Sequence, residues 1–335
     1  MTSPSQTISI NPKPTKTIRM NPQPNTINAP APVYIGVDVS KATLALNFPG
    51  FSGEYPNTLK GHRAIIKRLP KQAHIVMEST GGYQRAFARA LQAQSVAVSV
   101  VNARQVCNFA RALGQLAKSD AIDAEVITRF AQSIKPEGDR ELTQSELKLE
   151  EIMNRRQQLV ELCNIEGNRL EHYFESEIAE DAKALIAHLQ AKIKKLETMA
   201  KEIIEADAIL KAKVERLTQV KGVGLITSAS LIAFMPELGR LKRNKAAALV
   251  GVAPFVCDSG AERGKRHIWG GRAHLRKLLY MCALHAIGKN RLLKEFYQRL
   301  KSAGKPSKVA LTAVMRKLIC LLNHMLKNPN FSLAS

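Results

Sequence analysis

Hydrophobic positions along residues 33–135 form short continuous runs separated by stretches with helix-like spacing. The continuous runs predict buried strands at residues 33–39, 42–48, 74–79 and 96–101. Apolar side chains three or four positions apart predict helices at residues 62–69 and 83–94, and two more helices follow the last strand. Strands that alternate with helices indicate an α/β layer with partly parallel strands.

The pattern changes at residues 141–214, where charged residues dominate and apolar positions form a narrow stripe. Such a stripe predicts one or two long helices of the coiled-coil type, used as a spacer or for self-association. The alternative is a solvated helix packed on its own domain. The stripe consists of Leu149, Ile152, Leu159, Leu162, Leu185, Leu189, Ile193, Leu196, Ala200 and Ile203.

Residues 215–330 are expected to form a second globular unit, which is mainly helical. The unit opens with LTQVKGVGLITSASLIA, in which Gly222 and Gly224 separate two apolar helical stretches. This pattern is typical of a helix-hairpin-helix, where glycine lets backbone N–H groups approach a phosphate at a helix start, here beside Lys221. The alternative is a plain glycine turn between helices.

Residues 1–32 are predicted to be a disordered tail. They contain a near-repeat, TISINPKP and then TIRMNPQP, that is rich in Pro and Asn. Such a segment cannot bury enough apolar surface to offset its lost conformational entropy. The start of the chain shows no signal-peptide pattern, and the longest apolar runs fall short of a membrane span, so no membrane is expected.

The net charge of the chain is the composition feature that says most about its partners. Lys and Arg number 50 against 28 acids, which gives the 335-residue chain a net charge of +22. Residues 216–335 hold 22 basic and 4 acidic residues and so carry +18, whereas residues 136–215 hold 12 and 18 and carry −6. A basic surface this strong indicates a polyanionic partner, with nucleic acid as the default. The alternative is a highly charged protein that is merely soluble.

Five cysteines are scattered along the chain without a CxxC pair. Their spacing argues against a zinc site and against a disulfide framework. We therefore expect a reducing, cytoplasmic environment.

Four carboxylates are the candidate chemistry of the first unit. Asp38 and Glu78 end predicted strands, and Asp120 and Asp123 share one helix face near Ser119, a candidate N-cap. The carboxyl ends of parallel strands gather at one sheet edge, where the four acids would repel each other unless a hard cation such as Mg²⁺ neutralised them. Two such ions about 4 Å apart would clamp a phosphate. The alternative is a set of turn and cap residues.

The stretch YIGVDVSKATL has a second interpretation. It is similar to the first phosphate loop of actin-like ATPases and sugar kinases, in which an Asp after a strand precedes a turn of small residues. That fold also needs a second Asp-bearing strand with a Gly-rich turn and then an adenosine-binding GG segment. The later chain has neither in the right setting, and STGGYQ comes too early.

The motifs GVDVSK, MESTGGY and KSDAIDA are followed by GVGLITSASLIA and GVAPFVCDSGAERGKRHIWGGRAHLRKLLY. This order resembles the DEDD transposases of bacterial insertion sequences, which are also called bridge-RNA-guided recombinases. The resemblance covers about residues 33–330. Its specificity comes from the combination of the acid set with the C-terminal block.

The resemblance implies a fold of α/β plus α class. It comprises a RuvC-like (RNase H-like) domain at residues 33–140, a coiled coil at 141–214 and a transposase domain at 215–330. The family's serine nucleophile maps onto Ser259 in the stretch DSG, and it is implied to attack a DNA phosphate and form a covalent phosphoserine link. The catalytic acids, which would hold Mg²⁺, map onto Asp38, Glu78, Asp120 and Asp123.

The partners are also implied by the resemblance. A structured guide RNA, encoded by the mobile element itself, would pair with double-stranded target and donor DNA. Protomers would assemble as a dimer or tetramer with composite active sites, in the bacterial cytoplasm at the nucleoid. Delegating sequence choice to RNA fits the composition, because basic side chains can hold nucleic-acid backbones while base pairing does the reading.

The residues around Ser259 are consistent with that chemistry. The stretch VCDSGAERGKR is expected to form a turn that would expose the hydroxyl, although a turn serine without catalytic function gives the same pattern. Trp269 is expected either to stack on a base or to lie in the core. Asp258 and His267 are near, but no His–Asp pair has triad spacing. The cations that would hold the scissile phosphate are Arg263, Lys265, Arg266 and Arg272.

Two further functions remain open from the sequence. One is a metal-dependent Holliday-junction endonuclease of RuvC type, which cuts without a covalent intermediate and uses the C-terminal part only to bind DNA. The other is a non-catalytic nucleic-acid-binding protein, whose activities would depend neither on the four acids nor on Mg²⁺.

Overall fold

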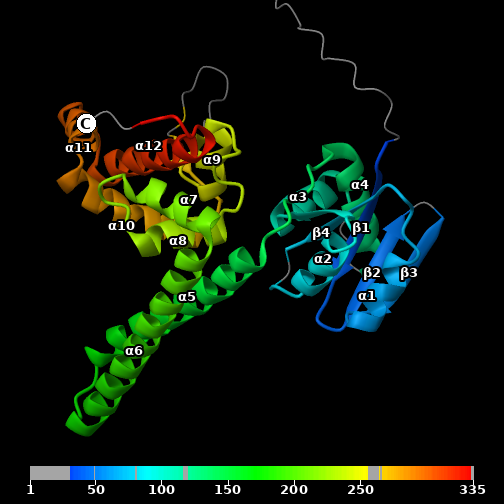
Figure 1. The fold of residues 1–335 in the computed structure, drawn as a ribbon, viewed down its shortest axis with the longest axis horizontal. Helices are drawn as coiled ribbons and strands as arrows, with labels where there is room; N and C mark the ends of the chain where they lie inside the picture. Colours follow the sequence, from blue (N-terminus) through cyan, green and yellow to red (C-terminus); the bar gives the residue numbers. More distant parts are fainter. Residues whose placement is uncertain are drawn as a thin grey trace, which may run out of the picture. The chain divides into compact units, whose positions relative to one another are not determined.

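The computed structural model describes residues 31–48, 50–79, 81–115, 120–255, 264 and 266–332. The chain divides after Asp139 into two compact units, residues 1–139 and 140–335 (Figure 1), and each unit is described by itself. The tail predicted at residues 1–32 lies outside the described residues except for Ala31 and Pro32.

Unit 1 is built on a five-stranded mixed sheet with the strand order β3-β2-β1-β4-β5. The first three strands form an antiparallel meander, and β4 and β5 run parallel to β1. This mixed α/β arrangement is compatible with the expected RNase H-like domain. The strands are β1 (Val33–Val39), β2 (Thr43–Phe48), β3 (Phe51–Pro56), β4 (Ala73–Glu78) and β5 (Ala97–Val101).

Helices cover both faces of this sheet because successive strand side chains point to opposite sides. Val37 and Met77 pack with α1 and α2 in one apolar cluster, whereas Val76 packs with α3 and α4 in another. The helix starts are capped by Thr58 and Asn102 at α1 and α3. The helices are α1 (Leu59–Ile66), α2 (Gln84–Gln92), α3 (Ala103–Ala112) and α4 (Asp120–Ile134).

The edge strand β3 was not among the predicted strands. Its sequence, FSGEYP, alternates half-buried and exposed positions and contains Gly53 and Glu54. It therefore lacks the continuous apolar run that marks the buried strands β1 and β4, and only its pairing with β2 shows it to be a strand.

Unit 2 begins with two long helices, α5 (Gln144–Leu170) and α6 (Ser176–Ala206), which lie side by side (Figure 1). Leu149 and Ala200 are buried in the core that these helices share with the C-terminal helices. Leu162 and Leu185 of the same predicted stripe are 46% and 43% exposed. The apolar seam is therefore narrow and merges at one end into a globular core.

Four of the described helices, α7, α9, α10 and α11, pack against α12 (Ser307–Lys327). Among the described helices, α12 is the one long and apolar enough to cross a membrane by length and composition. Nine of its residues, among them Leu318 and Leu322, are buried in the unit 2 core, which accounts for this composition. The other elements are α7 (Ala208–Thr218), α8 (Leu225–Phe234), α9 (Arg243–Val250), α10 (Ala273–Lys289), α11 (Arg291–Ser302) and a hairpin of β6 (Pro254–Phe255) and β7 (His267–Ile268).

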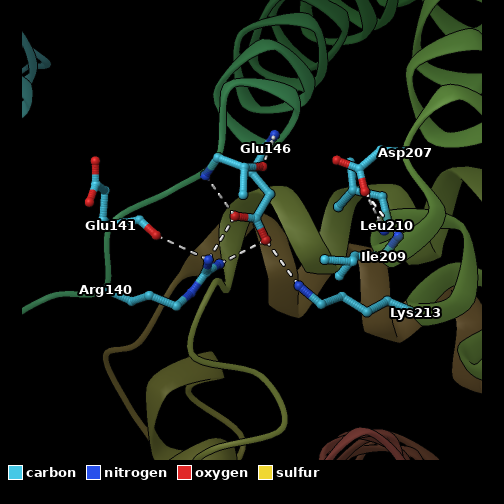
Figure 2. Close-up of polar contacts among 8 residues, drawn as sticks. Arg140, Glu141, Glu146, Asp207, Ile209, Leu210 and Lys213 are labelled. Carbon is cyan, nitrogen blue, oxygen red and sulfur yellow. Dashed lines mark hydrogen bonds and ion pairs between the residues drawn. The ribbon is translucent and has the colours of Figure 1, made fainter.

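A buried carboxylate fixes the start of α5 (Figure 2). Arg140 donates two hydrogen bonds to the oxygens of Glu146, at 2.7 and 2.8 Å, and the Lys213 ammonium donates a third at 3.0 Å. Thr143 and Glu146 also complete a capping box at the helix start. Burial opposes ionisation of Glu146, but the hydrogen bonds from Arg140, the Thr143 backbone and Lys213 outweigh burial and lower its pKa to about 2.

Candidate active site and nucleic-acid interface

Asp38 and Glu78 occupy equivalent positions on adjacent parallel strands. The β1–β4 register pairs Val37 with Met77, and each acid is the next residue along its strand. Because side chains alternate along a strand, both acids lie on the face opposite Val37 and Met77, toward the carboxyl edge of the sheet. Both are half-buried. Pairing of the strands thus brings together two carboxylates that are forty positions apart in the chain.

The helix that carries the other two acids packs on this same face. Gly36 lies against the backbone of α4, and a Cβ at this position would collide with the Ala124 carbonyl and with the Thr128 nitrogen and hydroxyl. The Thr128 hydroxyl accepts a hydrogen bond from the Gly36 N–H (2.8 Å) and directs its own proton toward the Asn47 (2.7 Å) and Ala124 carbonyls (3.0 Å). Gly36 and Thr128 therefore set how closely α4 approaches β1.

Asp120 and Asp123 belong to the first turn of α4, which begins at Asp120. The Asp123 side chain is half-buried, and it precedes Thr128 by about 7.5 Å along the helix axis. The Asp120 side chain and Ser119, the candidate N-cap, lie outside the described part of the chain.

The acids are suitable metal ligands by type, because carboxylate oxygens are what Mg²⁺ prefers. Among the described side chains, no three His, Cys, Asp or Glu residues are close enough together to hold one metal ion. The observation that bears on a metal site is therefore the Asp38–Glu78 pair in register on the face that α4 covers.

In unit 2, Ser259 falls in the sequence between β6 and β7, which pair as an antiparallel hairpin. The hairpin stem pairs Pro254 with Ile268 and Phe255 with His267. Ser259 and its neighbours Asp258, Arg263 and Lys265 lie outside the described residues, whereas the two strands that carry them are described.

The segments that flank the two hairpin strands are held by contacts that sequence reasoning did not predict. The Arg276 guanidinium of α10 donates a hydrogen bond of 2.5 Å to the Gly270 carbonyl. Gly271 has a φ of +69° and lies against Gly251, which ends α9 with a φ of +78°. The single glycine in VGVAP and the two glycines in IWGGR were the available signal, because closely packed backbones and positive φ favour glycine.

The cations near Ser259 have different environments. Arg266 is exposed, and the Trp269 side chain is 61% exposed, so Trp269 is not a core residue. Arg272 instead forms a bidentate ion pair with Glu237 (2.7 and 2.9 Å) and donates to the Phe234 carbonyl (2.7 Å). Burial raises the pKa of Glu237, but Arg272 outweighs burial and lowers the pKa below its ordinary value. The guanidinium that we expected on a phosphate thus contacts Glu237 and the Phe234 carbonyl in this structure.

The glycines of the expected helix-hairpin-helix also differ from each other. They lie between α7, which ends at Thr218, and α8, which begins at Leu225. Gly222 has a φ of +103° and packs against Ala286 of α10, so its lack of a side chain serves packing. Gly224 precedes α8 with open space where a Cβ would stand, and Lys221 is exposed. Backbone that a ligand can approach is found at Gly224.

Comparison with known proteins relates both units to one group. A family model described as "Transposase IS116/IS110/IS902 family" matches residues 214–298, and the DEDD model of IS110, described as "Transposase", matches residues 35–177. The chain is 25% identical over 310 residues to a pilin gene-inverting protein of Moraxella lacunata. It is 24% identical over 305 residues to one of Moraxella bovis. Each alignment covers 86% of this chain and 94% of the relative.

Proposed function

We propose that this chain, which belongs to the IS110 family of DEDD transposases and is therefore a DNA transposase, cuts and rejoins DNA strands through a covalent phosphoserine at Ser259. The observation that carries the proposal is that the two matched regions together contain both sets of candidate catalytic residues, the acids and the serine. Residues 35–177 include all four acids, and residues 214–298 include Ser259 with its hairpin. The name of the Moraxella relatives, pilin gene-inverting proteins, supports a recombinase that rearranges DNA.

The chemistry at Ser259 requires no external energy source. The Ser259 hydroxyl attacks a DNA phosphorus, the bond from phosphorus to one DNA oxygen breaks, and that DNA end leaves as an alcohol carrying the proton. A hydroxyl from another DNA end then attacks the phosphoserine and returns the proton to Ser259. The number of phosphoester bonds is the same before and after, so no nucleotide triphosphate is needed.

Positive charge around the hairpin supports the attack. The described residue Arg266 and the sequence neighbours Arg263 and Lys265 would stabilise the negative charge that grows on the phosphate. Lys221 and the open backbone at Gly224 would bind a phosphate elsewhere on the same unit, and exposed Trp269 would stack on a base.

The acids of unit 1 are proposed to hold Mg²⁺. Asp38 and Glu78 supply the adjacent pair, and Asp120 and Asp123 belong to the first turn of α4, which packs on the same face. Bound there, Mg²⁺ would supply charge neutralisation for a phosphate. The α4–β1 contact at Gly36 and Thr128, which sets how closely α4 approaches β1, supports this role.

The partners follow from the same proposal. Family membership implies DNA as substrate, and the charge of +18 on residues 216–335 suits DNA and a structured guide RNA that pairs with target and donor. Protomers are proposed to assemble as a dimer or tetramer with composite sites. We place the reaction in the bacterial cytoplasm, at the nucleoid.

Trapping tests the covalent step. DNA carrying the element ends, incubated with protein, Mg²⁺ and RNA co-purified with it, should yield a protein–DNA adduct that survives denaturation. Ser259→Ala should abolish the adduct and Ser259→Cys should retain a fraction of it, while Asp38→Asn should reduce both cutting and adduct. Cutting by Ser259→Ala at the wild-type rate would overturn the proposal and establish a metal-dependent junction endonuclease instead.

A further inference from the structure

A cavity of about 430 Å³ opens between α10, α12 and the strand β7 of the hairpin that carries Ser259. Its walls are mainly apolar and include Ile268 of β7, Met315 of α12 and, on α10, Tyr280 and Met281. Tyr280 and Met281 remain 39% and 53% exposed. An exposed aromatic ring beside two thioethers and an isoleucine therefore forms an accessible surface suited to a flat, apolar group.

Cations line the same cavity. Arg276 and Lys277 precede Tyr280 and Met281 by four positions each on α10, so the four side chains share one side of the helix. The Arg276 guanidinium is fixed by its hydrogen bond to the Gly270 carbonyl, and Lys277 is exposed. No acidic side chain is among the described residues that line the cavity. The site thus combines an aromatic platform with positive charge.

We propose that this cavity receives an unpaired base of the DNA substrate, with Lys277 and Arg276 next to the flanking phosphate. The volume lies within the ~300–1,000 Å³ typical of small-ligand pockets. A base within a paired duplex cannot enter such a site, because its faces are stacked and its edge is paired. A base released at a nick, a strand end or a junction exposes both faces and can stack on Tyr280.

The position of the cavity relative to Ser259 indicates DNA as the occupant. In this respect the inference rests on the proposed function. Ile268 of the cavity pairs with Pro254 across the hairpin stem. Ser259 lies four residues beyond Phe255 and therefore within about 14 Å of it along the chain. A base in the cavity would accordingly belong to the DNA segment next to the attacked phosphate. Local unpairing of that segment is what strand exchange requires.

The test measures binding without cutting. Ser259→Ala protein, without Mg²⁺, is titrated with fluorescent ten-nucleotide oligothymidylate and with an abasic oligonucleotide of the same length. Tyr280→Leu added to this protein should weaken oligothymidylate binding about tenfold, equivalent to ~1.4 kcal/mol, and leave abasic binding unchanged. Tyr173→Leu is the matched control, because Tyr173 is similarly exposed but lies between α5 and α6, and should change neither affinity.

Each other outcome overturns the inference. Equal weakening on both oligonucleotides would indicate lost folding or general charge, which thermal unfolding of Tyr280→Leu would identify. No weakening on either would exclude base stacking at Tyr280. In a parallel titration with oligouridylate, weakening by Tyr280→Leu of that binding alone would assign the cavity to RNA. In sedimentation, a smaller mass of the Tyr280→Leu protein would assign the cavity to a second copy of the chain. Because no strand is cut, failure here leaves the adduct experiment intact, and absence of an adduct leaves this result intact.

Discussion

The backbone N–H of Gly36 donates a 2.8 Å hydrogen bond to the hydroxyl of Thr128, which is 92 positions further along the chain. This contact joins the middle of β1 to the middle of α4, and these two elements carry three of the four candidate acids. Asp38 follows Gly36 by two positions, and Asp123 and Asp120 precede Thr128 by five and eight positions. The spacing between helix and sheet at this point therefore determines how close the carboxylates can be.

Gly36→Ala should disrupt this spacing. The added methyl group would overlap the Ala124 carbonyl and the Thr128 nitrogen, which are backbone atoms that cannot rotate away. We expect unit 1 to lose about 1–3 kcal/mol of unfolding free energy, measured by urea denaturation, together with most strand-cutting activity. Gly167→Ala is the control, because a Cβ there meets open space, and it should be neutral or slightly stabilising. Unchanged stability of Gly36→Ala would contradict the close contact.

Thr128→Val should separate the hydrogen bond from the packing, since valine has nearly the same shape as threonine. The Gly36 N–H, which is buried, would lose its acceptor, at a cost of about 1–3 kcal/mol in urea unfolding. Thr128→Ser retains the hydroxyl and should recover at least half of the lost stability. If serine and valine were equally destabilising, the threonine methyl group rather than the hydroxyl would be holding α4.

Glu146 should make the stability of unit 2 depend on acid. The pKa of its carboxyl is lowered from 4.5 to about 2 in the folded protein, so its contribution is complete above pH 4.5 and is lost as the pH falls toward 2. The difference in unfolding free energy between wild type and Glu146→Gln should be roughly 3 kcal/mol at pH 6 and below about 1 kcal/mol at pH 2.

The matched control for Glu146 is Glu141→Gln. Glu141 is exposed, and it is its backbone carbonyl that accepts a hydrogen bond from Arg140. Its substitution should leave the unfolding free energy within about 0.5 kcal/mol of wild type at every pH. A Glu146→Gln difference that stayed constant between pH 6 and pH 2 would show that the Glu146 carboxylate is not stabilised by its three donors.

Arg272 and Arg266 should respond in opposite ways to truncation. Arg272→Ala leaves Glu237 without its bidentate partner and should cost about 1–3 kcal/mol of stability. It should not change the dependence of DNA affinity on salt. Arg266→Ala should leave stability within about 0.5 kcal/mol and lower the slope of log K against log salt by about 1, because one phosphate contact is lost. A reduced slope for Arg272→Ala would restore the phosphate role expected from the sequence.

Much of unit 1 was predictable because its buried strands have a clear signal in the sequence. The runs VYIGV and IVM are continuously apolar, as expected of strands covered on both faces, and each leads directly into an acid. The edge strand β3 escaped prediction because one side of it faces solvent, so its sequence alternates. In the same way the narrow stripe at residues 141–214 predicted one or two long helices but not which end would enter a core.

By itself, the sequence determined the alternation of strands and helices, the concentration of positive charge in the last third, and the chain positions of the acids and Ser259. These properties are local, since they depend on composition, on periodicity within one element or on residues a few positions apart. Only the tertiary structure decided that Asp38 is level with Glu78, that Gly36 holds α4, and that Arg272 binds Glu237, 35 positions away. Strand register and side-chain partners depend on which distant elements pack together, and no local pattern encodes that choice.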